Sequence, residues 1–353
     1  MKNWRLLTFV GVMLLAACAE NEENTAEPVD DPGHTEETEV AEQEPERKED
    51  AEESQAYEDI HPLTGEPTND VSPYKPIAVM VNNHWDARPQ SGLSKADIVY
   101  EILTEGDLTR FLAIYHSEQP EKIGPVRSAR GYFVDIAEAH DAFFVTHGWS
   151  PEAEQMLQNG RVEFLNGLYH DGTLFERSAE RNRPHNSYIT FRNMLEGLNN
   201  KGYELKDEVD PLTFNDTNEH PAFTKQEGDI DISYRDKYFV SFTYNDEKQA
   251  YERSSDQEPT MDELENERVS PENVLVIQAS HRVIDDKGRR YIDLQSGGDG
   301  VLFQHGERLA VTWVNDDGRI VPKKDGEEIP LIPGQTWVNV VPSATVLEDV
   351  GID

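Results

Sequence analysis

Cysteine occurs once in this chain, at position 18, and this single residue limits how the chain can be stabilised. One thiol cannot form an intramolecular disulfide, and once it is acylated it can serve neither as a nucleophile nor as a metal ligand. The fold must therefore be held together by a hydrophobic core.

The residues before Cys18 predict export and lipid attachment. Lys2 and Arg5 precede an apolar run that ends at Leu15, which is shorter than the roughly 20 residues of a membrane span. Small residues then lead directly to Cys18, as in a bacterial lipobox, where the thiol accepts a diacylglyceryl group. We expect residues 1–18 to be a lipoprotein signal peptide and the mature protein to be membrane-anchored and palmitoylated on the extracytoplasmic face.

Residues 19–59 form a strongly acidic segment. They contain 18 Asp or Glu against Arg47 and Lys48, a net charge of −16 in a chain whose total is −38. The segment also has few apolar residues, so it cannot bury enough surface to offset the entropy lost on ordering. We therefore predict that it is a disordered tether. The acidic balance also argues against nucleic acid as a partner.

The first half of the remaining chain has the pattern of an α+β domain, which we place at residues 60–206. Apolar runs predict a buried strand at 77–81 and a hairpin of strands at 98–103 and 110–115. Helical spacing follows at 132–140, and Ser150-Pro151 is typical of a helix start. Further predicted elements are a strand at 142–146 and a helix at 190–200.

The second half is predicted to be mainly β. Residues 207–231 have few apolar runs and form a predicted connector. Beyond it, residues 232–345 form a smaller domain whose strand-like segments are 238–244, 274–278, 291–294, 301–304, 309–314 and 337–341. We interpret Gly297–Gly300 as a hairpin turn and residues 256–268 as a surface helix or mobile loop. The fold class is therefore α+β, with a mixed-sheet first domain that carries helices.

The chain resembles the YerB-like family of bacterial lipoproteins over nearly all of the folded region. The motifs that carry the resemblance are Arg88-Pro89-Gln90-Ser91-Gly92-Leu93, Ala96-Asp97-Ile98-Val99-Tyr100-Glu101, Thr109-Arg110, Gly124-Pro125-Val126-Arg127-Ser128-Ala129-Arg130, Arg183-Pro184-His185-Asn186 and Gly334-Gln335-Thr336-Trp337. The resemblance implies an α+β amino-terminal domain, a second smaller domain and surface anchoring, and it implies no known activity. After Arg253 the chain has Asp256-Gln257 where the family pattern implies a glycine-containing turn.

Two arginines mark the expected start of the helix after Gly124. Arg127 and Arg130 are three residues apart, so if the helix begins near Ser128, as we expect, both should lie on one side of its first turn. Cations are slightly unfavourable at a helix start, so this pair indicates an anionic partner. That partner is either a ligand or an internal carboxylate such as Glu101, Glu105 or Asp97.

Glu101 stands inside an apolar run, so its carboxylate must be paired or line a cleft. Arg110 or Arg127 would make it a structural ion pair, whereas an open cleft would let Glu101 and Glu105 act as acid and base. We expect Arg88, Glu101, Arg110, Arg127, Arg130 and His185 to converge.

Arg183, His185 and Asn186 occupy a polar loop that either contacts a ligand or braces its surroundings. No grouping of histidines and carboxylates has a familiar metal-ligand spacing, so we predict no metal and no cofactor.

Three hypotheses for the function remain. The first, which we favour, is a cell-envelope binding or scaffold protein whose arginine-rich patch takes a peptidoglycan fragment or an envelope protein. The second is a cell-wall hydrolase that uses Glu101 or Glu105 with His185, and the third is a structural assembly protein without a ligand. Whether the chain is an enzyme stays open, although the residues favour a binding role and identify no catalytic group.

Substitution Cys18→Ser should release the protein from the membrane or mislocalise it, because the acyl chains supply the anchoring energy. Membrane fractionation of cells that express each form tests this expectation. A processed serine variant that stays in the membrane pellet would contradict lipidation at Cys18.

Overall fold

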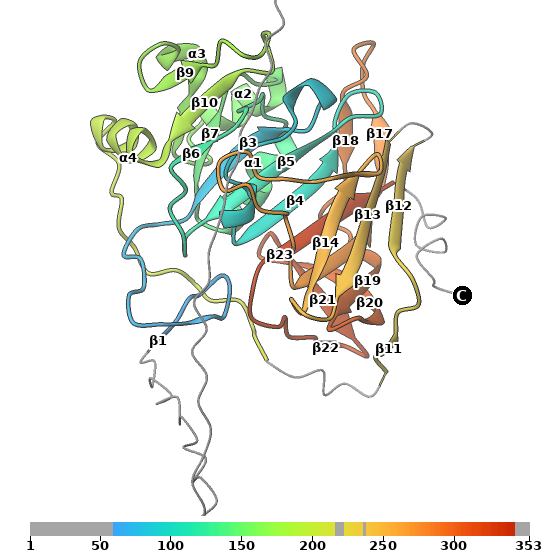
Figure 1. Ribbon diagram of the computed structural model, residues 1–353. Helices are drawn as coiled ribbons and strands as arrows, with labels where there is room; N and C mark the ends of the chain where they lie inside the picture. Colours follow the sequence, from blue (N-terminus) through green and yellow to red (C-terminus); the bar gives the residue numbers. More distant parts are fainter. Residues whose placement is uncertain (1–58, 216–221, 236–237, 343–353) are drawn as a thin grey trace, which may run out of the picture. The chain divides into compact units, whose positions relative to one another are not determined.

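One mixed sheet contains strands from both halves of the chain (Figure 1). The computed structural model describes residues 59–215, 222–235 and 238–342, and every structural statement below concerns these residues. The first half contributes, in sheet order, β4 (Ile98–Leu103), β5 (Thr109–Tyr115), β3 (Ile77–Asn82), β7 (Phe143–Thr146) and β8 (Phe164–Asn166). The second half contributes, in sheet order, β22 (Glu327–Glu328), β21 (Arg319–Lys324), β20 (Glu307–Asp316), β19 (Gly298–Gln304), β16 (Asn273–Gln278) and β23 (Thr336–Val341), with β11 (Thr224–Lys225) paired to β20.

Strand β23 joins the two halves. It lies between β16 and β4 and runs parallel to both, with Thr336 opposite Ile98 and Val340 opposite Ile102. The sheet therefore crosses the boundary that we predicted between residues 60–206 and 232–345. The division into two domains stays a prediction.

The first-half strands are apolar on both faces because both faces are covered. All six residues of β3 are buried. Ile77, Val79 and Val81 point into one core, while Ala78 and Met80 point into the other, as the two-residue period of a strand requires.

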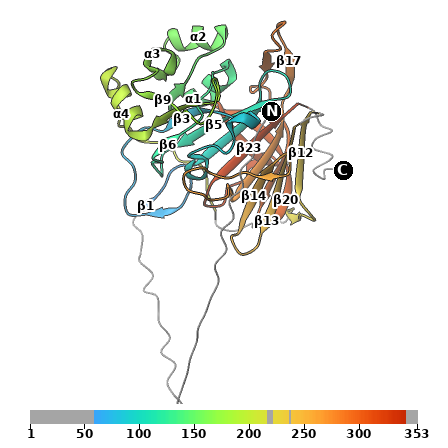
Figure 2. The same ribbon diagram turned by 45° about the horizontal axis from the view of Figure 1, so that its top comes forward.

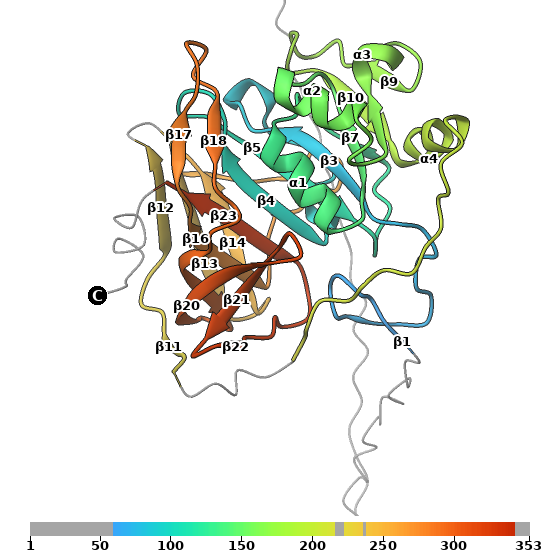
Figure 3. The ribbon, with the colours of Figure 1, turned by 180° about the vertical axis from the view of Figure 1, so that it is seen from behind.

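Helices cover both faces of this part of the sheet (Figure 3). Helices α1 (Gly131–Ala139) and α2 (Pro151–Gln158) pack on the face of Ala78, whereas α4 (Phe191–Asn200) packs on the face of Val79. The Ser150 hydroxyl caps α2 by accepting a hydrogen bond from Ala153 N at 3.2 Å, as Ser150-Pro151 predicts. The short α3 (Gly167–His170) follows β8.

A second antiparallel sheet covers the Val79 face near β23 (Figure 2). Its strands are β12 (Ile230–Arg235), β13 (Tyr238–Asn245), β14 (Ala250–Ser255) and β15 (Glu258–Pro259). The Trp337 ring packs edge-on against Phe111 at 5.1 Å and against Phe242 at 6.3 Å, and so links the two sheets.

Smaller elements complete the described chain. Two-stranded sheets pair β1 (Asp59–Ile60) with β2 (Pro67–Thr68) and β17 (His281–Val283) with β18 (Arg290–Ile292). A three-stranded sheet contains β6 (Lys122–Ile123), β10 (Ser187–Thr190) and β9 (Phe175–Arg177). Two 3₁₀ turns, η1 (Trp85–Ala87) and η2 (Leu93–Lys95), follow β3.

The predicted α+β class is confirmed, with three local corrections. Strands β11 and β12 begin inside the predicted connector 207–231. Gly298 and Gly300 lie in β19, paired with β20, rather than in a turn. Both positions need glycine, because a Cβ would lie 2.8 or 3.0 Å from a backbone oxygen of the neighbouring chain segment. Residues 256–268 contain turns and β15 but no helix, which excludes the first of the two predicted alternatives.

The turn between β14 and β15 has no glycine. Asp256 and Gln257 adopt positive φ values of 52° and 69°, the backbone of a two-residue hairpin turn of the primed type. The chain therefore keeps the turn that the family pattern implies and carries the conformational strain of non-glycine residues there.

Substitution Gly334→Ala should destabilise the fold by about 2–4 kcal/mol. Gly334 has φ of +126°, and a Cβ would lie 2.3 Å from the Glu272 carboxylate, which accepts a hydrogen bond from Gln335 N. Urea unfolding measures the loss. Gly160→Ala is the control, because Gly160 also has positive φ (+78°) but nothing within 4 Å of its Cβ position. Equal losses for the two variants would contradict the steric part of the argument.

Candidate functional site

The carboxyl ends of four strands meet at one edge of the large sheet. Strands β3, β7 and β8 are mutually parallel, and β4 runs in the same direction because β3 and β4 are both antiparallel to β5. His84 follows β3, Glu105 follows β4 and His147 follows β7. Ligands of open α/β sheets bind at such an edge, so we call it the carboxyl edge.

Residues 125–129 insert between β3 and β7 at this edge. Arg127 N donates to Met80 O at 2.9 Å, and Arg127 O accepts from His147 N at 3.1 Å. The backbone of Arg127 thus takes the place of a strand between β3 and β7. This position fixes Arg127 where the two parallel strands separate.

The guanidinium of Arg127 is half-buried, and among the described residues it has no hydrogen bond or ion pair. Burial lowers its pKa, as do the charges of Arg130 and Arg177, whereas Glu105 raises it. A half-buried cation without a partner is costly, and an anion that enters the site would remove that cost.

Glu105 is shared by two other arginines. Arg130 Nε donates to Glu105 Oε1 at 2.7 Å, and Arg110 donates to Oε2 at 3.3 Å. Burial lowers the pKa of Arg110 to about 9, and the charge of Arg130 lowers it as well. Because one carboxylate faces two guanidiniums, the group keeps a positive charge in a chain of net charge −38. We call Arg110, Arg127 and Arg130 the arginine cluster.

Helix α1 begins at Gly131, so Arg130 is its N-cap residue, without a side-chain capping bond. Arg127 lies before the helix rather than in its first turn. The expected helix start near Ser128 is therefore three residues too early, because Ala129 bridges to Trp149 as a strand would.

Glu101 has no exposed surface and lies on the face of β4 that also carries Val99 and Leu103. Arg110 lies on the opposite face of the sheet, with Leu112, so Glu101 does not join the arginine cluster. The Glu101 carboxylate accepts hydrogen bonds from Arg253 at 2.8 Å and from the Tyr238 hydroxyl at 2.7 Å. Trp337 Nε1 donates to it at 3.1 Å and Thr109 Oγ1 at 2.9 Å. The partner is Arg253 rather than Arg110 or Arg127, and the sequence offered no signal for a contact across 152 positions.

Two stacked histidines stand beside Arg127. The rings of His84 and His185 are 4.3 Å apart, and burial and the Arg127 charge lower the pKa of each. Asn82 Oδ1 accepts from His84 N at 3.2 Å, so Asn82 Nδ2 donates to His185 Nδ1 at 2.8 Å. His84 Nδ1 accepts from Asp86 N at 3.2 Å. In the neutral rings each Nε2 therefore carries the proton and can donate.

His84, Asp86 and His185 place their ligand atoms within 4.8 Å of one another, a trio that we did not predict from the sequence. A metal ion fits this trio poorly. The Nδ1 lone pairs of both rings already accept hydrogen bonds, and the Arg127 charge would repel a cation. The Nε2–H groups of the two histidines and the Arg127 guanidinium can instead donate hydrogen bonds to an anion.

Of the remaining predicted residues, Arg88 and Asn186 make internal contacts and Arg183 does so only weakly. Arg88 pairs with Asp256 at 2.8 Å and donates to Asn83 O at 3.0 Å. Asn186 donates to Ser178 O at 3.0 Å, and Arg183 is largely exposed, 3.8 Å from Asp171.

His147 and Arg177 also belong to the edge, and neither was among the site residues predicted from the sequence. Arg177 donates to His147 Nε2 at 2.8 Å and pairs with Asp171 at 2.9 Å. Burial lowers the pKa of His147 to about 4, and Arg177 adds to that shift. The signal that could have found His147 is its place after a predicted strand.

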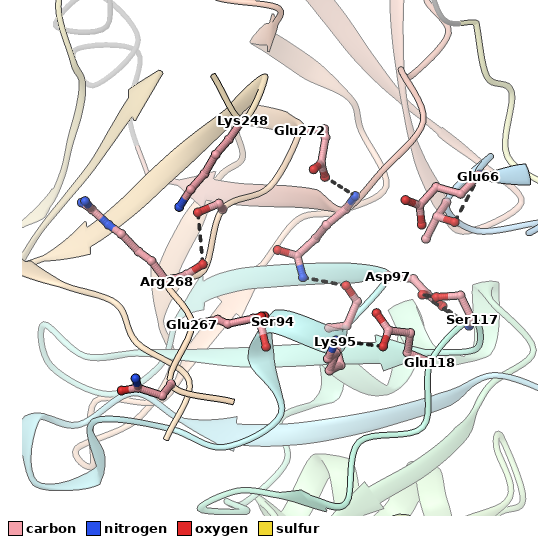
Figure 4. Close-up of a pocket in the computed structure, with 15 residues that line it drawn as sticks. Glu66, Ser94, Lys95, Asp97, Ser117, Glu118, Lys248, Glu267, Arg268 and Glu272 are labelled. Atoms are coloured by element: carbon pink, nitrogen blue, oxygen red, sulfur yellow. Dashed lines mark hydrogen bonds and ion pairs between the residues drawn. The ribbon is translucent and has the colours of Figure 1, made fainter. Parts of the chain in front are cut away.

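A polar cavity of about 550 Å³ lies at the opposite edge, before β4 and β23 (Figure 4). Burial raises the pKa of Asp97 and of Glu272 to about 7 each, although Ser117 and Gln335 donate to them. The cations of its wall are already paired: Lys95 with Glu118 at 3.0 Å, and Lys248 and Arg268 with Glu252 at 2.9 and 2.6 Å. This cavity offers an anion no unpaired cation.

Comparison with known proteins identifies the family. Residues 63–204 match "Protein of unknown function (DUF3048) N-terminal domain", and residues 230–338 match the corresponding C-terminal domain. The chain belongs to the DUF3048 family. It is 47% identical over 283 residues to "Putative lipoprotein YerB" of Bacillus subtilis (strain 168), covering 80% of this chain and 86% of that protein.

This DUF3048 chain is also similar to a solved structure, the crystal structure of the YerB protein from Bacillus subtilis. The TM-score is 0.77 with 45% identity, and the match covers 81% of this chain and 98% of that one. The predicted YerB-like resemblance is thus confirmed. The predicted signal peptide, Cys18 and nearly all of the tether lie outside the described residues, and within those residues no helix is long and apolar enough to cross a bilayer.

Substitution Arg253→Met should lower the free energy of unfolding by about 3–5 kcal/mol, because Glu101 would stay buried without its counter-charge. The double variant Glu101→Leu/Arg253→Met should lose less than the sum of the two single variants, as a double-mutant cycle in urea measures. Lys248→Met is the control, since its exposed pair with Glu252 contributes under about 1 kcal/mol. Additive single losses would mean that Glu101 and Arg253 are not coupled.

Proposed function

We propose that this chain is a lipid-anchored, extracytoplasmic binding protein of the cell envelope, which holds an anionic group at its arginine cluster. The observation that carries the proposal is Arg127, a half-buried guanidinium without a protein partner among the described residues. The cluster gathers positive charge at one edge of a strongly acidic chain, where ligands of open sheets bind.

Membrane anchoring rests on the residues before Cys18 and on the lipoprotein name of the Bacillus subtilis relative. An extracytoplasmic site would face peptidoglycan, whose stem peptides carry carboxylates, and other envelope components. A peptidoglycan fragment or an envelope protein with an exposed acidic group is therefore the partner class that we propose.

The hydrolase hypothesis has less support. A general acid or base must reach the reacting atoms, but Glu101 has no exposed surface. Both oxygens of Glu105 are bound by arginines. The assembly hypothesis explains Arg110 and Arg130 as bracing, although it leaves Arg127 unexplained.

Substitution Arg127→Ala should weaken binding of the anionic ligand by about 10- to 100-fold, the range expected for lost hydrogen bonds to a charged group. Calorimetric titration of the detergent-purified full chain with inorganic phosphate and with muropeptides measures this loss. The melting temperature should stay the same or rise, because the substitution removes repulsion with Arg130 and Arg177.

Arg192→Ala is the matched control, since Arg192 is exposed on α4. Arg127→Lys should retain part of the affinity, because lysine keeps the positive charge but cannot form the bidentate hydrogen bonds of a guanidinium. A lower melting temperature with unchanged binding would assign Arg127 to bracing and refute the binding proposal.

A further inference from the structure

The most exposed large aromatic side chain among the described residues stands beside the arginine cluster. Trp85 is 63% exposed. Its ring lies 3.8 Å from that of His84, which in turn stacks on His185 at 4.3 Å. The indole is tilted by 38° against the His84 ring, whereas His84 and His185 are stacked. The Arg127 charge acts on both histidines, so the exposed indole, the two imidazoles and the guanidinium belong to one group of side chains.

The backbone under Trp85 is firmly held. Ala87 N donates to His84 O at 2.8 Å, and Arg181 donates to Ala87 O at 2.5 Å. His84 caps the η1 turn by accepting from Asp86 N. A rigid turn that presents an indole to solvent is a preformed binding surface, because little further order is needed on binding.

The chemistry around Trp85 is that of a sugar site. An indole face packs against the C–H face of a pyranose, and neighbouring polar groups bind its hydroxyls. The Nε2–H groups of His84 and His185 are such donors, and their rings stay neutral at pH 7 because burial and Arg127 lower the pKa of both. Arg127 supplies the positive charge.

We propose that the ligand of the carboxyl edge is an anionic sugar, whose ring stacks on Trp85 and whose carboxylate or phosphate binds Arg127. This inference rests on the proposed function and adds the class of ligand. Free sugar acids and phosphosugars share this chemistry with acidic wall polysaccharides. A lipid surface is the other common partner of an exposed indole. Binding to an anionic bilayer needs a broad basic face around the indole, which the exposed Asp86 beside Trp85 interrupts. A single anionic sugar needs only one counter-charge, which Arg127 supplies.

The test titrates the full chain, purified in a detergent without a sugar headgroup, with three kinds of probe. The first is a bare anion, inorganic phosphate or acetate. The second is an anionic sugar, glucuronic acid or glucose 6-phosphate, together with an acidic polysaccharide. The third is the neutral methyl glucoside. Calorimetry gives the affinity, and tryptophan fluorescence reports contact with the indole.

We expect the anionic sugar to bind at least about tenfold more tightly than the bare anion, with a fluorescence change that Trp85→Phe largely removes. Trp85→Ala should reduce the affinity for the anionic sugar to that for the bare anion and leave the affinity for phosphate unchanged. Arg127→Ala should weaken the binding of both the anionic sugar and phosphate. Phe239→Ala is the control, because Phe239 is 51% exposed on β13.

Two results would overturn the inference and leave the proposed function intact: anionic sugars that bind no better than bare anions, or Trp85→Ala without effect on sugar affinity. Binding of anionic vesicles that depends on Trp85, without sugar binding, would assign the indole to a membrane instead. Failure of every anionic probe, together with an inert Arg127→Ala, would refute both proposals.

Discussion

The buried carboxylate of Glu101 fixes how the two sheets lie on each other. Removing a charge from water costs several kcal/mol, so the pair is stable only when its remaining hydrogen bonds are made. Arg253 of β14 supplies the counter-charge, and its guanidinium also lies 4.7 Å from the Trp337 ring centre. Asn83 donates to the same carboxylate at 3.3 Å. Because Asn83 directly precedes His84, the loop at the carboxyl edge is tied to this buried pair.

Local patterns were enough to predict most of the first-half fold. The apolar run at Ile77, the hairpin before Tyr115 and the Ser150-Pro151 cap are signals read within a few residues. The insertion of β23 between β16 and β4 has no such signal, because pairing of distant strands depends on which edges remain open in the folded chain. Strand β12 was missed although its alternating Ile230, Ile232 and Tyr234, which bury one face, have the two-residue period of a strand.

The candidate site was predictable only where its residues form a local pattern in the sequence. Arg127 and Arg130 attract notice as two cations ahead of a helix. That Arg127 has no side-chain partner in the described part of the chain is a property of three-dimensional packing, since Arg110 and Arg130 engage Glu105 in the fold. His84 and Trp85 lie in a short polar stretch with no motif of their own, and only the return of residues 125–129 beside β3 gives them a role.

The central place of β23 has a consequence for how the chain is completed. Thr336–Val341 is the last described strand in the sequence, yet it supplies the inner contact between β16 and β4. A chain that emerges from its amino terminus therefore presents β4 with an unpaired edge until Thr336–Val341 is available. Truncation before Thr336 would remove this strand and also Trp337, one of the donors that surround Glu101. Strand β23 thus decides whether β4 can close around its own buried charge.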